Sequence, residues 1–231
     1  MQNNDFNMED KMKILEVICS KGKTGFYFDD QKAIKCNMAV SDGLIYRGIP
    51  ITEGFTSIRQ PGESISVMLI LEDGQIAWGD CNAVQYSGAA GRDPLFLADV
   101  YIPVIEKYIR PILRGRRITT FREMAKEVDE FINPETGKRI HTAVRYGVTQ
   151  AILDAVAKSR KMLMAEVLAD EYNTKISDKL IPIFTQSGDD RYNAADKMIL
   201  KRVPVLPHAL INNVETKLGK DGGILLDYVK W

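Results

Sequence analysis

The hydrophobic pattern of this chain changes its period twice, and that change most limits the folds open to it. Over residues 13–81 several runs alternate apolar and other side chains, among them KILEVICS and ISVMLILEDGQIAWGD. Such alternation is typical of half-buried β-strands. Asp73-Gly74 separates two of these runs and is a strong hairpin signal. The first part of the chain therefore predicts an antiparallel sheet with long connections.

From Pro94 onward the apolar residues recur with the period of a helix. The segment DPLFLADVYIPVIEKYIRPIL predicts a helix with Asp93 as N-cap and Pro94 in the first turn, kinked or divided at Pro103. The next helix, in TFREMAKEVDEFI, opens with Thr120 and Glu123 at capping-box spacing.

A long helix with a broad apolar face is predicted in IHTAVRYGVTQAILDAVAKSRKM. The small residues Ala143, Gly147 and Ala151 recur every four positions, which suits close approach of another element. MAEVLADEY indicates a further short helix.

The second change of period follows these helices. LIPIFTQ predicts a new strand, a helix is expected from Asp190 to Lys201, and a last helix is expected in GGILLDYVKW. Strands followed by helices indicate an α+β domain, and a new βα unit indicates the beginning of a parallel barrel or an open sheet. We expect a polar tail over residues 1–11, an α+β domain over 12–172 and the start of a second domain over 173–231.

Charge and targeting signals restrict the partners and the location of the chain. Lys plus Arg equals Asp plus Glu, 31 against 31, which argues against a dedicated nucleic-acid or membrane surface. The N-terminus lacks the pattern of a secretory signal, and no apolar run approaches the ~20 residues that span a bilayer. Cys19, Cys36 and Cys81 match no zinc pattern, so free thiols in a reducing cytoplasm are expected.

Two polar features near the predicted hairpin are candidate ligand-binding elements. The glycine loop GAAGRDP could cradle an anion, but it lacks the P-loop lysine and the full dinucleotide pattern. A mobile glycine loop next to a ligand pocket is the better functional hypothesis, and an ordinary strand-to-helix turn is the alternative. Gln85, three residues before the loop, could hydrogen-bond a polar ligand or could simply be solvated.

Two carboxylates and two histidines invite other hypotheses. Asp189 and Asp190 could hold a metal, although their place at a helix start favours capping. His141 begins a strong amphipathic helix, where packing or capping is favoured. His208 could serve in proton transfer or charge stabilisation, and a structural histidine is the alternative.

Gln186 has the best physical case for binding a ligand. If its strand belongs to a parallel barrel, the residue lies at the C-terminal mouth, where such barrels build their active sites. Phe184 shares its face of the strand and would supply an apolar wall below it.

Several segments closely resemble methylaspartate ammonia-lyase of the enolase superfamily. They are KTGFYFDDQKAIK, GDCNAVQYSGAAGRDP, HTAVRYGVTQAILDAVAKSRK, IPIFTQSGDDRYNAADKMI and VLPHALINNVETKLG, in one collinear order from about Met12 to Trp231. The resemblance implies an enolase-like N-terminal capping domain over 12–172, followed by the first βα segments of an incomplete TIM-type barrel over 173–231.

The resemblance also implies an activity and roles for three residues. The family eliminates ammonia from L-threo-3-methylaspartate to give mesaconate, in glutamate degradation. Gln186 matches a glutamine that binds a substrate carboxylate, and Gln85 matches a cap-domain glutamine near the amino group. His208 matches a catalytic histidine that contacts the substrate and helps to stabilise the anionic intermediate.

The cofactor and partners follow from the same resemblance. The family uses Mg²⁺, whose ligands lie with the basic lysine on barrel strands beyond Trp231, so we expect no metal ligand in this chain and an inactive isolated chain. The implied partners are a small amino-acid substrate and, for the complete enzyme, a second copy in a homodimer. The rest of the barrel is expected either on the same polypeptide or on a separate chain. A non-catalytic binding or assembly module, and another enolase-superfamily lyase, are the alternatives.

Overall fold

The computed structural model describes residues 11–41, 45–88, 91–185, 190–205, 211 and 213–231. The chain divides into two compact units, Met1–Ile176 and Ser177–Trp231. Each unit is described by itself.

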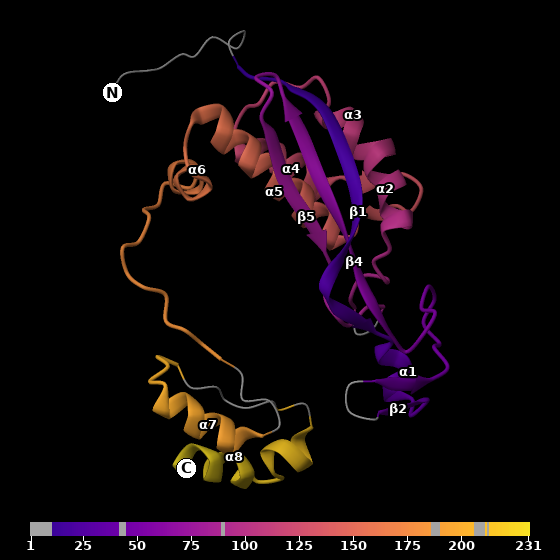
Figure 1. Cartoon of the computed structure of the whole chain (residues 1–231), viewed down its shortest axis with the longest axis vertical. Helices are drawn as coiled ribbons and strands as arrows, with labels where there is room; N and C mark the ends of the chain where they lie inside the picture. Colours follow the sequence, from indigo (N-terminus) through magenta and orange to yellow (C-terminus); the bar gives the residue numbers. More distant parts are fainter. Residues whose placement is uncertain (1–10, 42–44, 89–90, 186–189, 206–210, 212) are drawn as a thin grey trace. The chain divides into compact units, whose positions relative to one another are not determined.

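The first unit is built on a three-stranded antiparallel sheet in the order β1-β4-β5 (Figure 1). Its strands are β1 (Ile14–Asp29), β4 (Arg59–Leu71) and β5 (Ile76–Asn82). The predicted hairpin at Asp73-Gly74 is confirmed, because it joins β4 to β5 and Gly74 takes a φ of +86°. That left-handed conformation favours glycine.

The register of the sheet separates a buried face from an open face. Val17, Leu69 and Ala77 are paired across the three strands and are all buried. One position further along, Ile18 pairs with Met68 and Met68 with Trp78, and Ile18 and Trp78 remain 43% and 50% exposed. This is the alternation that the sequence predicts for half-buried strands.

Helices from two parts of the chain cover the buried face of the sheet, since α2 (Ala98–Val104) and α3 (Arg110–Leu113) pack on β1. α5 (Thr142–Arg160) packs on β5, and α4 (Phe121–Glu130) packs against α5 (Figure 1). The predicted apolar face of α5 is confirmed, since Val144, Val148 and Ile152 are fully buried. The sheet and these helices form one continuous core.

The helical segment after the glycine loop begins later than the sequence predicts. α2 (Ala98–Val104) has Leu97 at its N-cap and no side-chain cap, so the prediction that Asp93 caps this helix is wrong. Pro94 consequently lies outside the helix. The Asp93 carboxylate instead accepts a hydrogen bond from the Thr142 N–H, at 2.8 Å, and so caps α5. Asp93 therefore caps a helix that begins 49 positions later instead of the helix that follows it directly.

Pro103 divides this helical segment, as predicted. The α-helix gives way after Val104 to a π-helical turn, η2 (Ile105–Ile109), and then to α3 (Arg110–Leu113). Proline has no N–H to donate, so the regular ladder is interrupted there.

Half of the predicted capping box of α4 forms. The Thr120 hydroxyl accepts a hydrogen bond from the Glu123 N–H. Glu171, at the end of α6 (Met164–Glu171), accepts hydrogen bonds from the Phe121 and Arg122 N–H groups. The predicted short helix α6 thus exists and helps to close the N-terminus of α4.

Smaller elements complete the first unit. They are α1 (Gln31–Lys35), β2 (Ala39–Ser41), β3 (Tyr46–Gly48), β6 (Ile132–Asn133) and β7 (Lys138–Arg139), with β2 paired to β3 and β6 to β7.

The second unit contains α7 (Arg191–Leu200), the π-helical turn η3 (Val214–Leu218) and α8 (Gly223–Lys230). The strand predicted from LIPIFTQ is reduced, within its described residues, to a single parallel bridge between Phe184 and Val205. The bridge brings together the chain segments before and after α7, as in a βαβ unit. A strand extends only where neighbours pair with it, and Leu180 and Ile181 are 95% and 88% exposed.

Asp190 occupies the predicted position at the N-cap of α7. Its carboxylate accepts hydrogen bonds from the Asn193 side-chain amide rather than from a backbone N–H. Asp189 lies outside the described residues.

Within the described part of the chain, no helix is both long enough and apolar enough to cross a membrane.

Candidate functional site

Gln85 follows β5 in an extended segment that is bound to the end of β1. Its side-chain Nε2 donates a hydrogen bond to Asp29 Oδ2 at 2.6 Å. Its backbone carbonyl accepts a hydrogen bond from the Asp29 N–H at 3.0 Å, and Tyr86 forms a parallel bridge with Asp29. Gln85 is therefore held through both its main chain and its amide, rather than solvated.

Arg59 holds the other side of the same carboxylate. Its Nε and Nη2 donate to the two oxygens of Asp29 at 2.7 and 2.9 Å, and Asp29 is only 1% exposed. The Arg59 guanidinium also lies over the rings of Tyr27 and Tyr46, 3.7 and 4.6 Å from their centroids. The hydrogen bonds to Asp29 raise the pKa of Arg59. We call Asp29, Arg59, Gln85, Tyr27 and Tyr46 together the Asp29 cluster.

The neighbouring carboxylate, Asp30, ties a third segment to the cluster. It accepts hydrogen bonds from the N–H groups of Ala33, Ile51 and Thr52 and from the Thr52 hydroxyl, at 2.6–3.1 Å. Burial would raise the pKa of Asp30, but these hydrogen bonds outweigh it and hold the pKa below its usual range. The end of β1 thus anchors the loop at 51–52 and the segment that carries Gln85.

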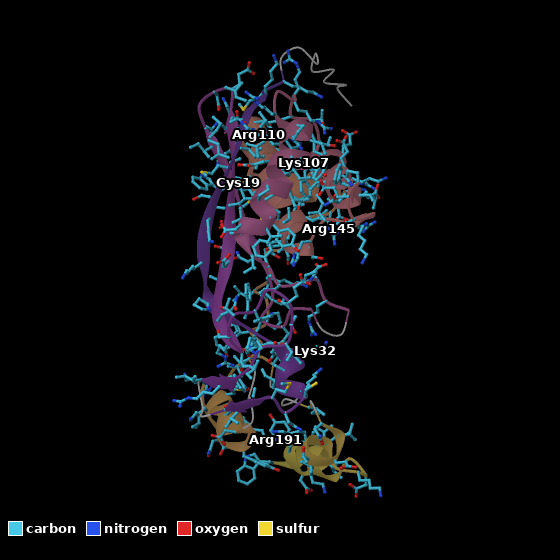
Figure 2. The ribbon with its side chains drawn as sticks, turned by 90° about the vertical axis from the view of Figure 1, so that its right-hand side faces the viewer. Cys19, Lys32, Lys107, Arg110, Arg145 and Arg191 are labelled. Carbon is cyan, nitrogen blue, oxygen red and sulfur yellow. The ribbon has the colours of Figure 1, made fainter. Side chains whose placement is uncertain are left out.

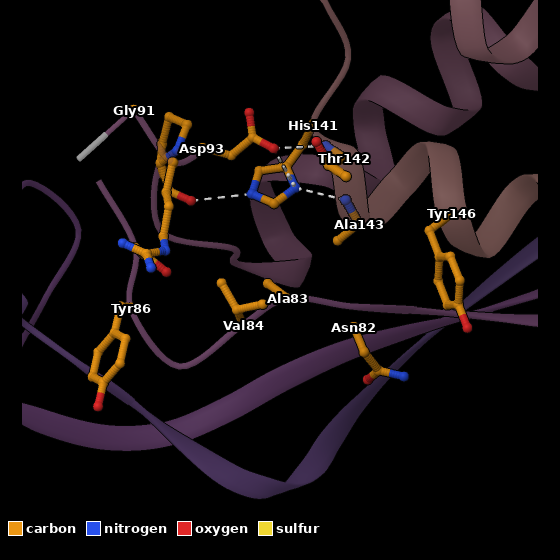
Figure 3. A pocket seen from close by; sticks show the side chains of 13 residues that line it. Asn82, Ala83, Val84, Tyr86, Gly91, Asp93, His141, Thr142, Ala143 and Tyr146 are labelled. Carbon is orange, nitrogen blue, oxygen red and sulfur yellow. Dashed lines mark hydrogen bonds and ion pairs between the residues drawn. The ribbon is translucent and has the colours of Figure 1, made fainter. Parts of the chain in front are cut away.

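A cavity of about 520 Å³ lies beside the segment that follows β5 (Figure 3). Val84 and Tyr86 line it, whereas Gln85 does not, because alternate side chains of an extended segment point in opposite directions. His141, Asp93 and Tyr146 also line the cavity. It is therefore separate from the Asp29 cluster, although both are built from the same segment.

His141 serves as a cap and packing residue, as predicted. Its Nδ1 accepts a hydrogen bond from the Ala143 N–H, and its Nε2 lies 3.1 Å from the Pro94 carbonyl oxygen (Figure 3). These partners fit the neutral tautomer with the proton on Nε2. Burial lowers the pKa of His141, and its ring packs against Phe96 and Tyr101.

The glycine loop is only partly described, since residues 89–90 lie outside the described residues. Gly88 and Gly91, on either side, have φ of +65° and +76°. Arg92 lies over the Tyr86 ring, 5.8 Å from its centroid.

Two of the predicted site residues, Gln186 and His208, also lie outside the described residues. Their roles as carboxylate ligand and catalytic histidine remain predictions. The geometry of the candidate site therefore comes from Gln85 and its partners alone.

The family resemblance implies Mg²⁺, which takes oxygen ligands. Among the described residues, no group of three or more His, Cys, Asp or Glu side chains could hold a metal ion.

The three cysteines are free thiols, as predicted. Cys19 lies on β1 near Arg110 (Figure 2), and burial raises the pKa of its thiol to about 11. Burial also raises the pKa of Cys81 to about 12, whereas Cys36 is exposed.

The sequence alone did not single out Asp29 and Arg59. The signal was present in FYFDD, where two carboxylates directly follow an apolar strand and buried carboxylates need partners. The identity of those partners is set by contacts 30 and 56 positions away in the chain.

Comparisons with known proteins agree with this architecture. The family model described as methylaspartate ammonia-lyase N-terminus matches residues 12–173, and the model for the C-terminus of the same enzyme matches 175–231. The methylaspartate ammonia-lyase of Clostridium tetanomorphum is 64% identical over 220 residues, and that of Citrobacter amalonaticus is 56% identical. Each alignment covers 95% of this chain and 52% of the relative. The chain thus spans about half the length of the curated relatives it matches.

Solved structures show the same fold. A Mg-complex of the Clostridium tetanomorphum enzyme superposes with a TM-score of 0.84 over 95% of this chain and 52% of that chain. The Citrobacter amalonaticus enzyme with (2S,3S)-3-methylaspartic acid gives 0.83 at 55% identity, over 95% of this chain and 53% of that one. The architecture is that of an enolase-superfamily capping domain with part of a barrel. Because the two family models together match nearly the whole chain, it belongs to the methylaspartate ammonia-lyase family.

Proposed function

We propose that this chain provides the capping domain and the first barrel segment of a methylaspartate ammonia-lyase. In the reaction, the C3–H and C2–N bonds of L-threo-3-methylaspartate break, a C2–C3 double bond forms, and mesaconate and ammonia leave. The observation that carries the proposal is the 64% identity to the Clostridium tetanomorphum enzyme over 95% of this chain. The presence of (2S,3S)-3-methylaspartic acid in the Citrobacter amalonaticus structure supports the choice of substrate.

Three residues of this chain bind the substrate in this proposal. Gln186 binds a substrate carboxylate, and His208 contacts the substrate and stabilises the anionic intermediate. Gln85 contacts the amino group. The fixed position of the Gln85 side chain, through Asp29, supports its role as a preorganised ligand.

The remaining chemistry comes from residues beyond those described. Removal of a proton next to a carboxylate needs a strong electrostatic partner for the charge that develops. In this proposal the Mg²⁺ ligands and the basic lysine belong to later barrel strands, on the same or a second polypeptide. The isolated chain therefore forms no mesaconate.

A partner that completes the barrel is supported by exposed apolar side chains of the second unit. Leu180, Ile181 and Leu200 are 95%, 88% and 83% exposed, which is unusual unless another surface covers them. The complete enzyme would be a cytoplasmic homodimer. If the chain instead behaves as a stable monomer and no polypeptide that completes a barrel binds to it, a non-catalytic binding module becomes the better proposal.

The proposal is tested by supplying the part of the relatives that this chain does not span. This chain is fused to the part of the Clostridium tetanomorphum enzyme that lies beyond the matched region, and mesaconate absorbance is followed with 3-methylaspartate and Mg²⁺. We expect turnover from the fusion and none from the chain alone. A folded fusion without activity would contradict the proposed function, and turnover by the chain alone would contradict the assignment of metal and base to other residues.

A further inference from the structure

The orientation of the Gln85 amide is dictated by the charge pair behind it. Arg59 donates to both oxygens of Asp29, which identifies them as acceptors. Only a donor can therefore face Oδ2 at 2.6 Å, and in a glutamine that donor is Nε2. The opposite orientation would place two acceptor oxygens against each other.

Arg59 and Asp29 and the Gln85 backbone are themselves held in fixed positions. The stacking of Arg59 on Tyr27 and its two hydrogen bonds to Asp29 restrict the guanidinium. The main-chain hydrogen bond from Asp29 to the Gln85 carbonyl fixes the backbone from which the amide projects. Folding therefore already orders the Gln85 side chain, so ligand binding does not carry the entropy cost of ordering it.

With Nε2 committed to Asp29, the amide presents Oε1, which can only accept hydrogen bonds. An amino or ammonium group offers the complementary N–H donors. We propose that Asp29, held by Arg59, is a positioning residue that turns the Gln85 carbonyl oxygen toward the amino group of the substrate. This inference rests on the proposed function, in which Gln85 contacts that group.

The charge balance of the cluster gives this role a specific consequence. The guanidinium of Arg59 offsets the carboxylate of Asp29, so the ammonium group meets a neutral amide dipole. The substitution Asp29→Asn removes the negative charge that faces Arg59 and allows the amide to reverse. Both changes weaken the binding of a cation, so ammonium binding is the sensitive measurement.

The first test needs no activity and uses the chain as it is. The side-chain amide of Gln85 is assigned by NMR through its loss in Gln85→Ala. We expect its hydrogen-bonded proton to exchange slowly with solvent and to lose that protection in Asp29→Asn, whereas Arg59→Lys, which keeps the charge, largely preserves it. The matched control is Gln75, whose Nε2 donates to Asp73 at the same 2.6 Å but in an exposed hairpin turn. An unprotected Gln85 amide in the unmutated chain would overturn the inference without any variant.

The second test uses the fusion enzyme in the reverse direction, with mesaconate and ammonium chloride. We expect Asp29→Asn and Gln85→Ala each to raise the KM for ammonium at least about tenfold, with a smaller change in the KM for mesaconate. Because Asp29 acts through Gln85, the double variant should be no worse than Gln85→Ala alone. Asp73→Asn should leave both KM values unchanged.

Together the two tests distinguish a failure of the proposed function from a failure of the positioning role of Asp29. A fusion enzyme that never turns over rejects the proposed function and the ammonium role, while the NMR experiment still decides the orientation of Gln85. An active fusion in which the two substitutions have additive effects on the KM for ammonium would reject the positioning role and leave the proposed function intact.

Discussion

Gly147 of α5 lies directly against Cys81 of β5. A Cβ atom added to Gly147 would stand 2.6 Å from the Cys81 backbone nitrogen, a separation that real Cβ atoms do not show. The approach is mutual, because a Cβ on Gly79 of β5 would stand 2.6 Å from the Ala151 backbone nitrogen of α5. The helix therefore rests on the sheet at backbone-to-backbone distance, and both glycines are needed for it.

We expect Gly147→Ala to lower the free energy of unfolding by about 1–3 kcal/mol, because α5 would have to move away from β5. Urea unfolding of the chain, followed by circular dichroism, measures the change. Gly25→Ala is the control, since nothing lies within 4 Å of a Cβ at that glycine and its φ is not positive. Equal midpoints for Gly147→Ala and the unmutated chain would contradict the close packing.

The sequence predicted the elements whose cause is local. The Asp73-Gly74 turn, the divided helix at Pro103 and the small-residue stripe of α5 each depend on neighbouring residues, and the structure has all three. The same local reasoning failed for Asp93, because its hydrogen-bond partner Thr142 lies 49 positions away.

The candidate site depends on long-range contacts to a greater extent. The sequence marks Gln85 as a candidate and the family resemblance implies its role, but its support by Asp29 and Arg59 follows from strand pairing that no local pattern encodes. The strand predicted at LIPIFTQ shows the same limit. Its alternation is local, whereas its extension requires neighbouring strands.

The carboxylate of Asp30 should be more important for stability than an ordinary buried carboxylate. All four of its hydrogen-bond partners are donors, so the NH₂ group of Asp30→Asn would face at least one of them. We expect a loss of about 2–3 kcal/mol in the free energy of unfolding, measured in urea. The exposed Asp178 provides the control, and Asp178→Asn should change little. A loss of similar size in both variants would contradict the role of Asp30 as an anchor.

The cysteines should differ sharply in reactivity. Cys36 is exposed, whereas burial raises the pKa of Cys19 to about 11 and that of Cys81 to about 12, which suppresses their thiolates. In the folded chain at pH 8 we expect one thiol to react rapidly with iodoacetamide, and all three to react in urea. Mass spectrometry of peptides identifies the modified residue. In Cys36→Ser the fast reaction should disappear, and rapid labelling of Cys81 would show that the β5–α5 contact opens readily.

The residue at the C-cap of α5 has a strained backbone conformation, and a substitution to glycine would relieve that strain. Lys161 takes a φ of +54° at the C-cap, a conformation that glycine adopts without a Cβ penalty. We expect Lys161→Gly to raise the free energy of unfolding by about 0.5–1 kcal/mol. The same change at Lys126, an exposed position inside α4, should lower it by about 1 kcal/mol because there glycine only adds backbone entropy to the unfolded state. A thermal melt of both variants measures the two signs, and destabilisation by Lys161→Gly would contradict the strain.

His141 should make the stability of the fold depend on pH. Burial lowers its pKa, with the nearby charge of Arg145 acting the same way, and these effects outweigh the Pro94 carbonyl and Asp93, which raise it. Tyr101 packs edge-on against the ring and adds no charge at this pH. Because the folded pKa lies below the unfolded value of about 6.5, the unfolded chain binds the proton more readily. The contribution of His141 is therefore complete above about pH 6.5 and is lost as the pH falls through the folded pKa.

Unfolding in urea at intervals between pH 7.5 and 5 measures this dependence. We expect the free energy of unfolding to fall with pH in the unmutated chain and to fall less steeply in His141→Asn, which keeps a capping side chain but does not titrate. His208→Gln removes the other histidine and is the control, so it should retain most of the slope. If His141→Asn has the slope of the unmutated chain while His208→Gln is flat, the pH dependence belongs to His208 and not to the buried cap of α5.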